Sequence, residues 1–176
     1  MKERLPEQHH LDFFRKHLSY GPLTGVVRWR NPSSIRVKDG QEAGYTSSQG
    51  YRRLTLSRNG KQRMFAMHRV VWYLWYGIWP TSEIDHRDRN KGNNCIQNLR
   101  LVSRPQNVRN QGLHCKNKSG FRGVHFRRDV GKWRAKAYNS GEQINLGYYS
   151  TPEEASAAVE AFYKKLDGSD YLPPRR

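Results

Sequence analysis

The sequence is poor in cysteine and in acidic residues, and it contains no long apolar run. Two cysteines, Cys95 and Cys115, occur among 176 residues, too few for a disulfide framework or a four-thiolate zinc site. The longest apolar run, VVWYLWYGIW, is about half a membrane span and contains a glycine. The N-terminus, MKERLPEQHH, lacks the apolar core of a secretory signal. These absences predict a soluble cytoplasmic protein with reduced thiols and no membrane segment.

The scarcity of acidic residues leaves a large positive charge. The chain has 32 Lys and Arg against 15 Asp and Glu, a formal net charge of +17. The excess is dispersed, with 14 basic and 5 acidic residues in 1–80, 6 and 3 in 81–112, and 12 and 7 in 113–176. A surface this basic attracts a polyanion, and nucleic acid is the first candidate. A solvated basic surface without such a partner is the alternative.

The first eighty residues contain both helix and strand patterns. Three stretches rich in β-branched and aromatic residues predict strands, and Asn59-Gly60 favours a type I′ turn between the last two. A short amphipathic helix is expected before the strands, and a largely apolar, buried helix after them, ended by Gly77 and Pro80. The predicted helices cover 11–20 and 69–77, and the predicted strands cover 25–30, 51–57 and 63–68.

The segment from 83 to 110 contains six asparagines. Asparagine is a poor helix and strand former, so this number calls for another role. EIDH and NLRLVS read as two strands, and Ser103 followed by Gln106 predicts the start of a short helix over 104–110. The loop between the strands, RDRNKGNNCIQ, is polar and long for a hairpin, which favours a functional role.

Three residues of this segment suit phosphodiester hydrolysis. His86 could deprotonate an attacking water near neutral pH. Asp85 and Asn107 could supply the oxygen ligands that a hard cation such as Mg²⁺ prefers. Because successive strand residues face opposite ways, Asp85 and His86 can converge on one site only if the strand ends or bends there.

The spacing of these residues closely resembles that of the HNH endonuclease family. Asn98 follows His86 by twelve residues, and Asn107 follows nine residues later. The framework NN…NLR…QN..N agrees, as do the upstream GY and HRVVWYLWYG, which occur before this motif in phage-encoded members. The segment is similar to the homing-endonuclease branch, in which Asn replaces the later His.

This resemblance implies a ββα-metal fold with His86 as general base and a divalent metal, Mg²⁺ or Mn²⁺, held by Asp85 and Asn107. It also implies that Asn98 ties the long loop together by hydrogen bonds to the backbone. Members with a structural zinc use paired CxxC motifs, which this chain lacks, so no structural zinc is expected. The nuclease domain would cover residues 1–112, with its motif at 83–110, and the protein would be phage-encoded and act in a bacterial host cell. Arg100 would either touch a phosphate or face solvent.

The C-terminal part follows a linker over residues 113–119. Three strand patterns over 120–128, 132–138 and 144–150 are separated by turn signals. A helix is predicted to begin at Thr151 and end at Gly168, with a capping box completed by Glu154. Its apolar face is expected to contain Ala155, Ala158, Val159, Phe162, Tyr163 and Leu166. A separate domain over residues 120–170, a three-stranded antiparallel sheet packed on one helix, is therefore expected.

Alternation along KWRAKAY gives this sheet two different faces. Trp133, Ala135 and Ala137 share the face to be covered by the helix, and the polar side chains share the other. Arg and Lys can read guanine or bind phosphates, whereas Gln and Asn suit adenine. The DNA-binding candidates of this domain are Arg122, His125, Arg127, Arg134, Lys136, Tyr138, Gln143 and Asn145, and Arg100 joins them from the nuclease motif.

The elements RGV, GKW, LG, T.EEA and the Ala-rich helix resemble the plant AP-two (ethylene-response-factor) DNA-binding domain. The resemblance covers residues 120–168 and implies that the sheet lies in the major groove of double-stranded DNA with the helix behind it. The chain departs from the plant pattern at Asn145, where a Trp is usual, and at His125, where an Arg is usual.

The sequence as a whole predicts an α+β protein whose strand-rich N-terminal region leads into a ββα-metal hairpin. The leading hypothesis is a metal-dependent DNA endonuclease of the HNH homing type, targeted by its C-terminal domain. The main alternative is a sequence-specific DNA-binding regulator whose nuclease fold is catalytically inactive. The asparagine-rich segment could also be only a turn in a DNA-binding protein. A basic RNA-binding assembly protein is a third, for which no RNA-binding motif is present.

Overall fold

The computed structural model describes residues 5–110, 112–168 and 171. The chain forms two compact units, Met1–Val102 and Ser103–Arg176. The boundary between them precedes the helix over 104–110, whereas the predicted nuclease domain extended to residue 112. Residues 169 and 170, the end of the predicted C-terminal domain, lie outside the described residues.

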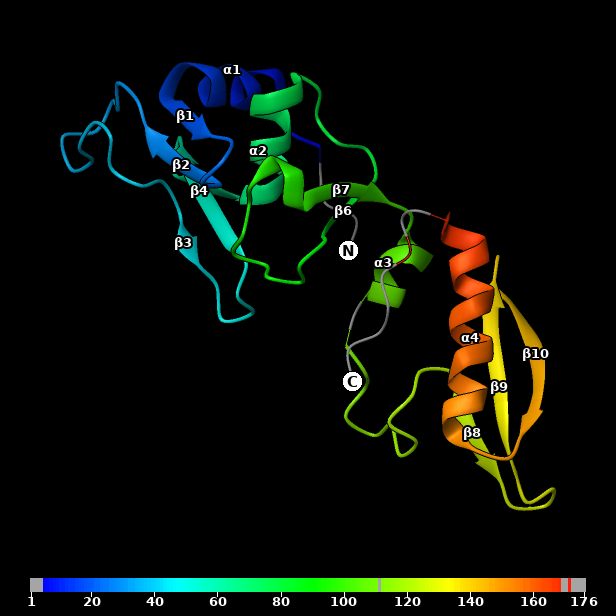
Figure 1. The fold of residues 1–176 in the computed structure, drawn as a ribbon. Helices are drawn as coiled ribbons and strands as arrows, with labels where there is room; N and C mark the ends of the chain where they lie inside the picture. The colour runs from blue at the N-terminus through cyan, green and yellow to red at the C-terminus, as the bar shows by residue number, and fades with distance from the viewer. Residues whose placement is uncertain (1–4, 111, 169–170, 172–176) are drawn as a thin grey trace. The chain divides into compact units, whose positions relative to one another are not determined.

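Within its described residues, the first unit combines two α-helices with three small antiparallel sheets (Figure 1). Strand β1 pairs with β2, β4 lies between β3 and β5, and β6 pairs with β7. The elements are α1 (Gln8–His17), β1 (Leu18–Gly21), β2 (Val26–Trp29), β3 (Tyr45–Thr46), β4 (Arg52–Arg58), β5 (Lys61–Ala66), α2 (Met67–Tyr76), β6 (Glu83–His86) and β7 (Leu99–Val102).

Local sequence signals account for several of these elements. Asn59 and Gly60, between β4 and β5, both have positive φ, 51° and 72°, as the predicted type I′ turn requires. Gly77 ends α2 in the left-handed conformation, and its N–H donates to the carbonyl of Tyr73. A single core joins these elements, with Phe14 of α1, Phe65 of β5 and Val70 of α2 almost completely buried.

Two expectations for this unit are wrong. The helix predicted over 11–20 ends at His17, because Leu18 to Gly21 pair with β2 instead and Leu18 is buried in the core. The apolar helix α2 is not covered on every side, since Trp75 and Tyr76 are each 51% exposed. Long-range pairing and packing override the local pattern in both cases.

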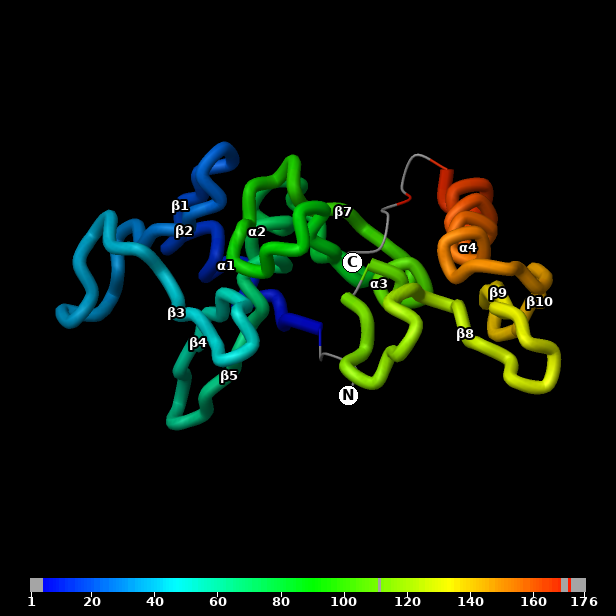
Figure 2. The backbone as a smooth tube through the Cα atoms, turned by 60° about the horizontal axis from the view of Figure 1, so that its bottom comes forward, coloured from blue at the N-terminus to red at the C-terminus, as the bar shows by residue number. Residues whose placement is uncertain are grey.

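The second unit contains a three-stranded antiparallel sheet with a helix across one face (Figures 1 and 2). The strands β8 (Val124–Arg127), β9 (Lys132–Asn139) and β10 (Glu142–Tyr149) have β9 in the centre. Helix α4 (Pro152–Asp167) buries Ala155, Val159 and Tyr163 against the sheet, but Leu166 is 42% exposed, contrary to the prediction. The predicted capping box is formed by Thr151 and Glu154. Helix α3 (Arg104–Asn110) is also part of this unit.

Each described helix is too short or too polar to span a lipid bilayer.

The turn between β1 and β2 packs closely against the loop between β6 and β7. Gly25 has φ of +71°, and a Cβ atom at this position would lie 2.6 Å from Cys95 N and 2.7 Å from the carbonyl carbon of Asn94. The amide of Ile96 donates to Pro22 O at 3.3 Å, and Cys95 Sγ donates to Leu23 O at 3.0 Å. The β6–β7 loop is therefore fixed by a turn some seventy residues earlier in the chain.

Gly25→Ala is expected to destabilise the first unit more than Gly40→Ala does. Gly40 has nearly the same φ, +74°, but no atom lies within 4 Å of a Cβ there. Both substitutions incur about 1–2 kcal/mol for the left-handed backbone. Only Gly25→Ala adds an overpacking cost of about 1–3 kcal/mol. Urea denaturation of the two variants measures the difference, and equal free energies of unfolding would show that the close contact does not hold the loop.

Candidate active site

The candidate site is built on the β6–β7 hairpin. Asp85 lies opposite Arg100 and His86 opposite Leu99 in the antiparallel register. β6 ends at His86, where the amide of Arg89 donates to His86 O at 2.9 Å and Arg89 takes a positive φ of 62°. The strand ends at His86, as it must if the side chains of Asp85 and His86 are to serve one site. Both Asp85 and His86 are buried.

The imidazole of His86 is held by Asn94. Its Nε2 lies 3.2 Å from Asn94 Oδ1, and Asn94 is only 2% exposed. With Oδ1 as acceptor, Nε2 carries the proton, and Nδ1 is the nitrogen that keeps the lone pair. Burial lowers the pKa of His86, although the bond to Asn94 and the charge of Asp85 oppose the shift. No role was assigned to Asn94 from the sequence, so this contact was not predicted.

Two further rings surround His86. The centroid of His68 lies 5.4 Å from that of His86, edge-on at 89°, and the centroid of Tyr51 lies 6.1 Å away. Burial, then the charge of His86, lowers the pKa of His68 to about 3, so this imidazole is neutral at physiological pH. Lys91 of the loop lies over the ring of Tyr51, with Nζ 4.8 Å from the centroid. Tyr51 belongs to the upstream GY motif, and His68 belongs to HRVVWYLWYG. The sequence therefore contained a signal for both residues, but it did not indicate that their rings lie beside His86.

Asn90, Asn93 and Asn98 brace the loop around Asp88. Asn98 Nδ2 donates to Asp88 Oδ1 at 2.9 Å and to Asn93 O at 2.8 Å, and Asn98 Oδ1 accepts from the Asp88 amide. Asn93 Nδ2 donates to Asp88 Oδ2 at 2.6 Å, and the Asn90 amide donates to Oδ1 at 2.8 Å. Burial raises the pKa of Asp88, but these bonds outweigh it and hold the pKa below its usual value. The asparagines thus satisfy backbone groups that strands or helices would otherwise pair.

Arg100 forms a buried ion pair with Asp85. Its Nε and Nη2 donate to Asp85 Oδ2 at 3.0 and 2.9 Å, and the two side chains are 6% and 7% exposed. The expectation that Arg100 could face solvent is wrong, because the cross-strand register places it against Asp85. A contact between Arg100 and a phosphate stays a prediction. In such a contact, the guanidinium would bind the phosphate and Asp85 at the same time.

Helix α3 carries Asn107. Ser103 precedes the helix, and its amide and hydroxyl both donate to Gln106 Oε1 at 3.0 Å, while the amide of Asn107 donates to Ser103 O at 3.0 Å. Asn107 belongs to the second compact unit, whereas Asp85 and His86 belong to the first. Its role as a metal ligand stays a prediction.

The donors predicted for a metal are one carboxylate and one amide oxygen. Among the described residues, no group of three His, Cys, Asp or Glu side chains is arranged to hold a metal ion. The Asp and Asn pair still fits Mg²⁺ chemically, because this ion usually keeps several waters and takes one or two protein oxygens together with phosphate oxygens.

The outer face of the C-terminal sheet carries most of the predicted DNA-binding residues. Ala135 and Ala137 are fully buried under α4, so the alternate residues of β9 point away from the helix. Arg134 Nε donates to Asn145 Oδ1 at 3.1 Å. A bulge between Asn145 and Gly147 also places Tyr148 opposite Arg134, which alternation alone did not predict.

The other candidates of this face differ in their contacts. Tyr138 OH donates to Gln143 Oε1 at 3.0 Å, Lys136 Nζ lies 5.9 Å from the centroid of the Tyr138 ring, and Arg127 pairs with Asp129. Burial and then the charge of Lys136 lower the pKa of His125, which lies opposite Arg134. Arg122 is different, because its Nη1 and Nη2 donate to the carbonyls of Val108 and Gly112, both at 3.3 Å.

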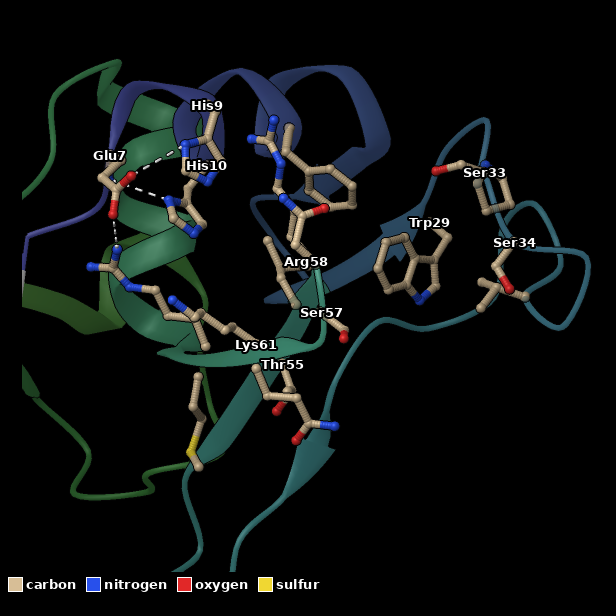
Figure 3. Close-up of a pocket in the computed structure, with 18 residues that line it drawn as sticks. Glu7, His9, His10, Trp29, Ser33, Ser34, Thr55, Ser57, Arg58 and Lys61 are labelled. Carbon is tan, nitrogen blue, oxygen red and sulfur yellow. Dashed lines mark hydrogen bonds and ion pairs between the residues drawn. The ribbon is translucent and has the colours of Figure 1, made fainter.

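A wide groove of about 1330 Å³ lies elsewhere in the first unit, between the start of α1 and the β4–β5 hairpin (Figure 3). Glu7, His9 and His10 line one side, Trp29, Ser33 and Ser34 line the other, and residues of the hairpin, including Arg58 and Lys61, lie between them. Neither Asp85 nor His86 lines it, so the candidate active site is distinct from the groove.

Comparison with known proteins identifies the segment that holds this site. Residues 65–109 match the family model described as HNH endonuclease. This segment is similar to the HNH endonuclease family. It runs from β5 through α2 and the β6–β7 hairpin into α3, so the HNH segment crosses the boundary between the two compact units.

A curated relative and a solved structure are also similar. Over 63 residues, the chain is 41% identical to the DNA endonuclease I-HmuI of Bacillus phage SP01. The aligned stretch covers 35% of this chain and 36% of that protein. The solved structure described as "DNA binding and cleavage by the HNH homing endonuclease I-HmuI" is 29% identical, with a TM-score of 0.42 over 56% of this chain and 53% of that one. The chain thus matches about a third of the length of the curated relative.

Arg100→Ala is expected to lower the stability of the first unit by about 3–5 kcal/mol, because it leaves the carboxylate of Asp85 buried without its ion-pair partner. The control is Arg36→Ala, which removes an exposed arginine of the same unit and should change stability by less than about 0.5 kcal/mol. Chemical denaturation of both variants gives the comparison. A loss for Arg100→Ala no larger than that of the control would mean that the ion pair contributes nothing to the HNH segment.

Proposed function

We propose that this protein is a metal-dependent DNA endonuclease of the HNH homing type. The observation that carries the proposal is His86, buried at the end of β6 with Nε2 bound to Asn94, within a segment that matches the HNH endonuclease family model. A relative described as a DNA endonuclease supports DNA as the substrate, as does the net charge of +17.

In the proposed reaction, Nδ1 of His86 accepts a proton from a water, and the water oxygen attacks the phosphorus. The bond from phosphorus to the departing sugar oxygen breaks, and that oxygen acquires a proton from solvent. Asn94 keeps the ring in the tautomer whose Nδ1 has a lone pair. Burial lowers the pKa of His86, and this direction favours the neutral ring, which is the form that can act as a base.

Asp85 and Asn107 are proposed to hold the divalent metal, Mg²⁺ or Mn²⁺. When bound, such an ion supplies positive charge that stabilises the phosphate and the leaving oxygen. Chain connectivity supports the pairing, because β7 leads into α3 with only Ser103 between them and Asp85 lies on the strand paired with β7. Asn98 is proposed to contribute through the loop that it braces.

The C-terminal unit is proposed to target the enzyme to double-stranded DNA. Its sheet and helix carry the sequence elements that resemble the AP-two domain, and the outer face of the sheet is basic and polar. Asn145 orients Arg134 through the bond to Nε, which would reduce the cost of ordering the guanidinium on a base edge or phosphate.

One observation favours a second function, a DNA-binding regulator without nuclease activity. The guanidinium of Arg100 lies against Asp85, the proposed metal ligand, and could stand in for a metal cation. Cleavage assays distinguish the two functions, because both predict DNA binding and only the first predicts cutting.

The central test is cleavage of supercoiled plasmid by purified protein with Mg²⁺, with and without EDTA. Wild-type protein should cut with Mg²⁺ and not with EDTA, and His86→Ala should lose at least about 100-fold in rate because the general base is gone. DNA binding should change little, since affinity depends mainly on the dispersed Lys and Arg. His114→Ala, which removes an exposed histidine outside the HNH segment, is the control. Absence of cutting by the wild type under all metal conditions would favour the regulator.

A second prediction concerns targeting. Arg134→Ala should lower affinity for the preferred DNA site by about 1–3 kcal/mol if the guanidinium reads a base, with little change on unrelated DNA. Lys165→Ala, which removes an exposed positive charge from α4, is the control and should affect both DNAs alike. Cleavage mapping on long DNA identifies the site, and titration of labelled duplexes gives the affinities. An equal loss on both DNAs would assign Arg134 to phosphate binding.

A further inference from the structure

Helix α3 is held by the last residue of α4. Asp167 accepts hydrogen bonds from Arg109 Nε at 2.9 Å and Nη2 at 2.5 Å, and its Oδ1 also lies 3.4 Å from Gln106 Nε2. The side chains of Arg109 and Asp167 are only 15% and 7% exposed. An ion pair this well covered is screened little by salt, and two parallel bonds fix the orientation of the guanidinium.

Two more side chains of the C-terminal unit contact the same helix. The Cζ atom of Arg109 lies 4.9 Å from the centroid of the Tyr163 ring, so the guanidinium contacts both this ring and Asp167. Arg122 donates to the carbonyl of Val108 from Nη1 and to that of Gly112 from Nη2. Arg122 therefore uses its guanidinium on the backbone at the end of α3.

These contacts surround Asn107 in the sequence. Gln106 precedes it, and Val108 and Arg109 follow it. By sequence, α3 belongs to the HNH segment, which extends to residue 109. By its contacts, α3 belongs to the unit that carries the proposed DNA-binding sheet. A helix of seven residues is far below the length that is stable alone in water, so its order depends on these contacts.

We infer that Asp167 and Arg109 are positioning residues that hold the helix of the metal ligand Asn107. The inference rests on the proposed function, because it takes Asn107 to be a ligand of the catalytic metal. Partners that orient a ligand contribute to metal affinity although they never touch the ion. The C-terminal unit then has two roles, since it binds DNA and also keeps a ligand of the active site in place.

The test uses full-length protein with Asp167→Asn, compared with Glu153→Gln. Each variant removes one negative charge from α4, but Glu153 is exposed in the first turn. Plasmid cleavage is followed as a function of Mg²⁺ concentration, and DNA binding is measured in EDTA. Asp167→Asn should raise the Mg²⁺ concentration needed for half-maximal cleavage by about tenfold, as expected for the loss of an orienting partner. Glu153→Gln should leave it unchanged, and both variants should bind DNA as the wild type does.

Substitutions of Arg109 give an independent reading if Asp167→Asn does not fold. Arg109→Lys keeps a charged donor for Asp167 and should need less Mg²⁺ than Arg109→Ala. Half-maximal Mg²⁺ concentrations for Asp167→Asn and Arg109→Ala equal to that of Glu153→Gln would overturn the inference.

Asn107→Ala separates this inference from the proposed function. Cleavage by Asn107→Ala at the wild-type rate would overturn the assignment of the metal ligand and the inference with it. Loss of cleavage in Asn107→Ala, together with unchanged metal dependence in Asp167→Asn, would overturn the positioning role alone.

Discussion

The hydrogen bond between His86 Nε2 and Asn94 Oδ1 is the interaction on which the candidate site depends. It fixes both the direction of the imidazole and the nitrogen that keeps a lone pair. Asn94 can form it only because its backbone is fixed in turn, by the hydroxyl of Tyr20 on its carbonyl at 2.9 Å and by the close approach of Gly25. A buried polar group that loses its partner costs about 1–3 kcal/mol, so the loop is stable only when these contacts form together. The β1–β2 hairpin is thus as much a part of the candidate site as the strands that carry the proposed catalytic residues.

Charged side chains are arranged differently on the surface and in the interior of the protein. On the surface, Lys and Arg are spread along both compact units, which suits weak, additive attraction to a DNA backbone. In the interior, Arg100 with Asp85 and Arg109 with Asp167 are paired and largely covered. Such pairs contribute little net stability relative to apolar residues, but removing one partner is costly. We interpret these two ion pairs as interactions that fix the orientation of the segments that carry Asp85 and Asn107.

Much of the fold follows from the sequence where local signals are strong. The capping box at Thr151, the turn at Asn59-Gly60 and the alternation along β9 each locate an element correctly. β1 could not be located, because Leu18 to Gly21 take their conformation from pairing with β2. The Asp-His pair at 85–86 and the spacing to Asn98 and Asn107 were enough to predict the HNH segment. The partners of these residues could not be predicted, because Asn94 resembles a turn residue and Arg109 meets Asp167 fifty-eight residues away.

In the proposed mechanism, a water activated by His86 cuts the DNA backbone. Cleavage in water enriched in oxygen-18, followed by mass spectrometry of the new ends, tests it directly. Wild-type protein with Mg²⁺ should yield cut ends whose phosphate carries a single heavy oxygen, because the attacking oxygen comes from solvent. Cut ends without heavy oxygen, or intact DNA under every metal condition, would contradict the proposed mechanism.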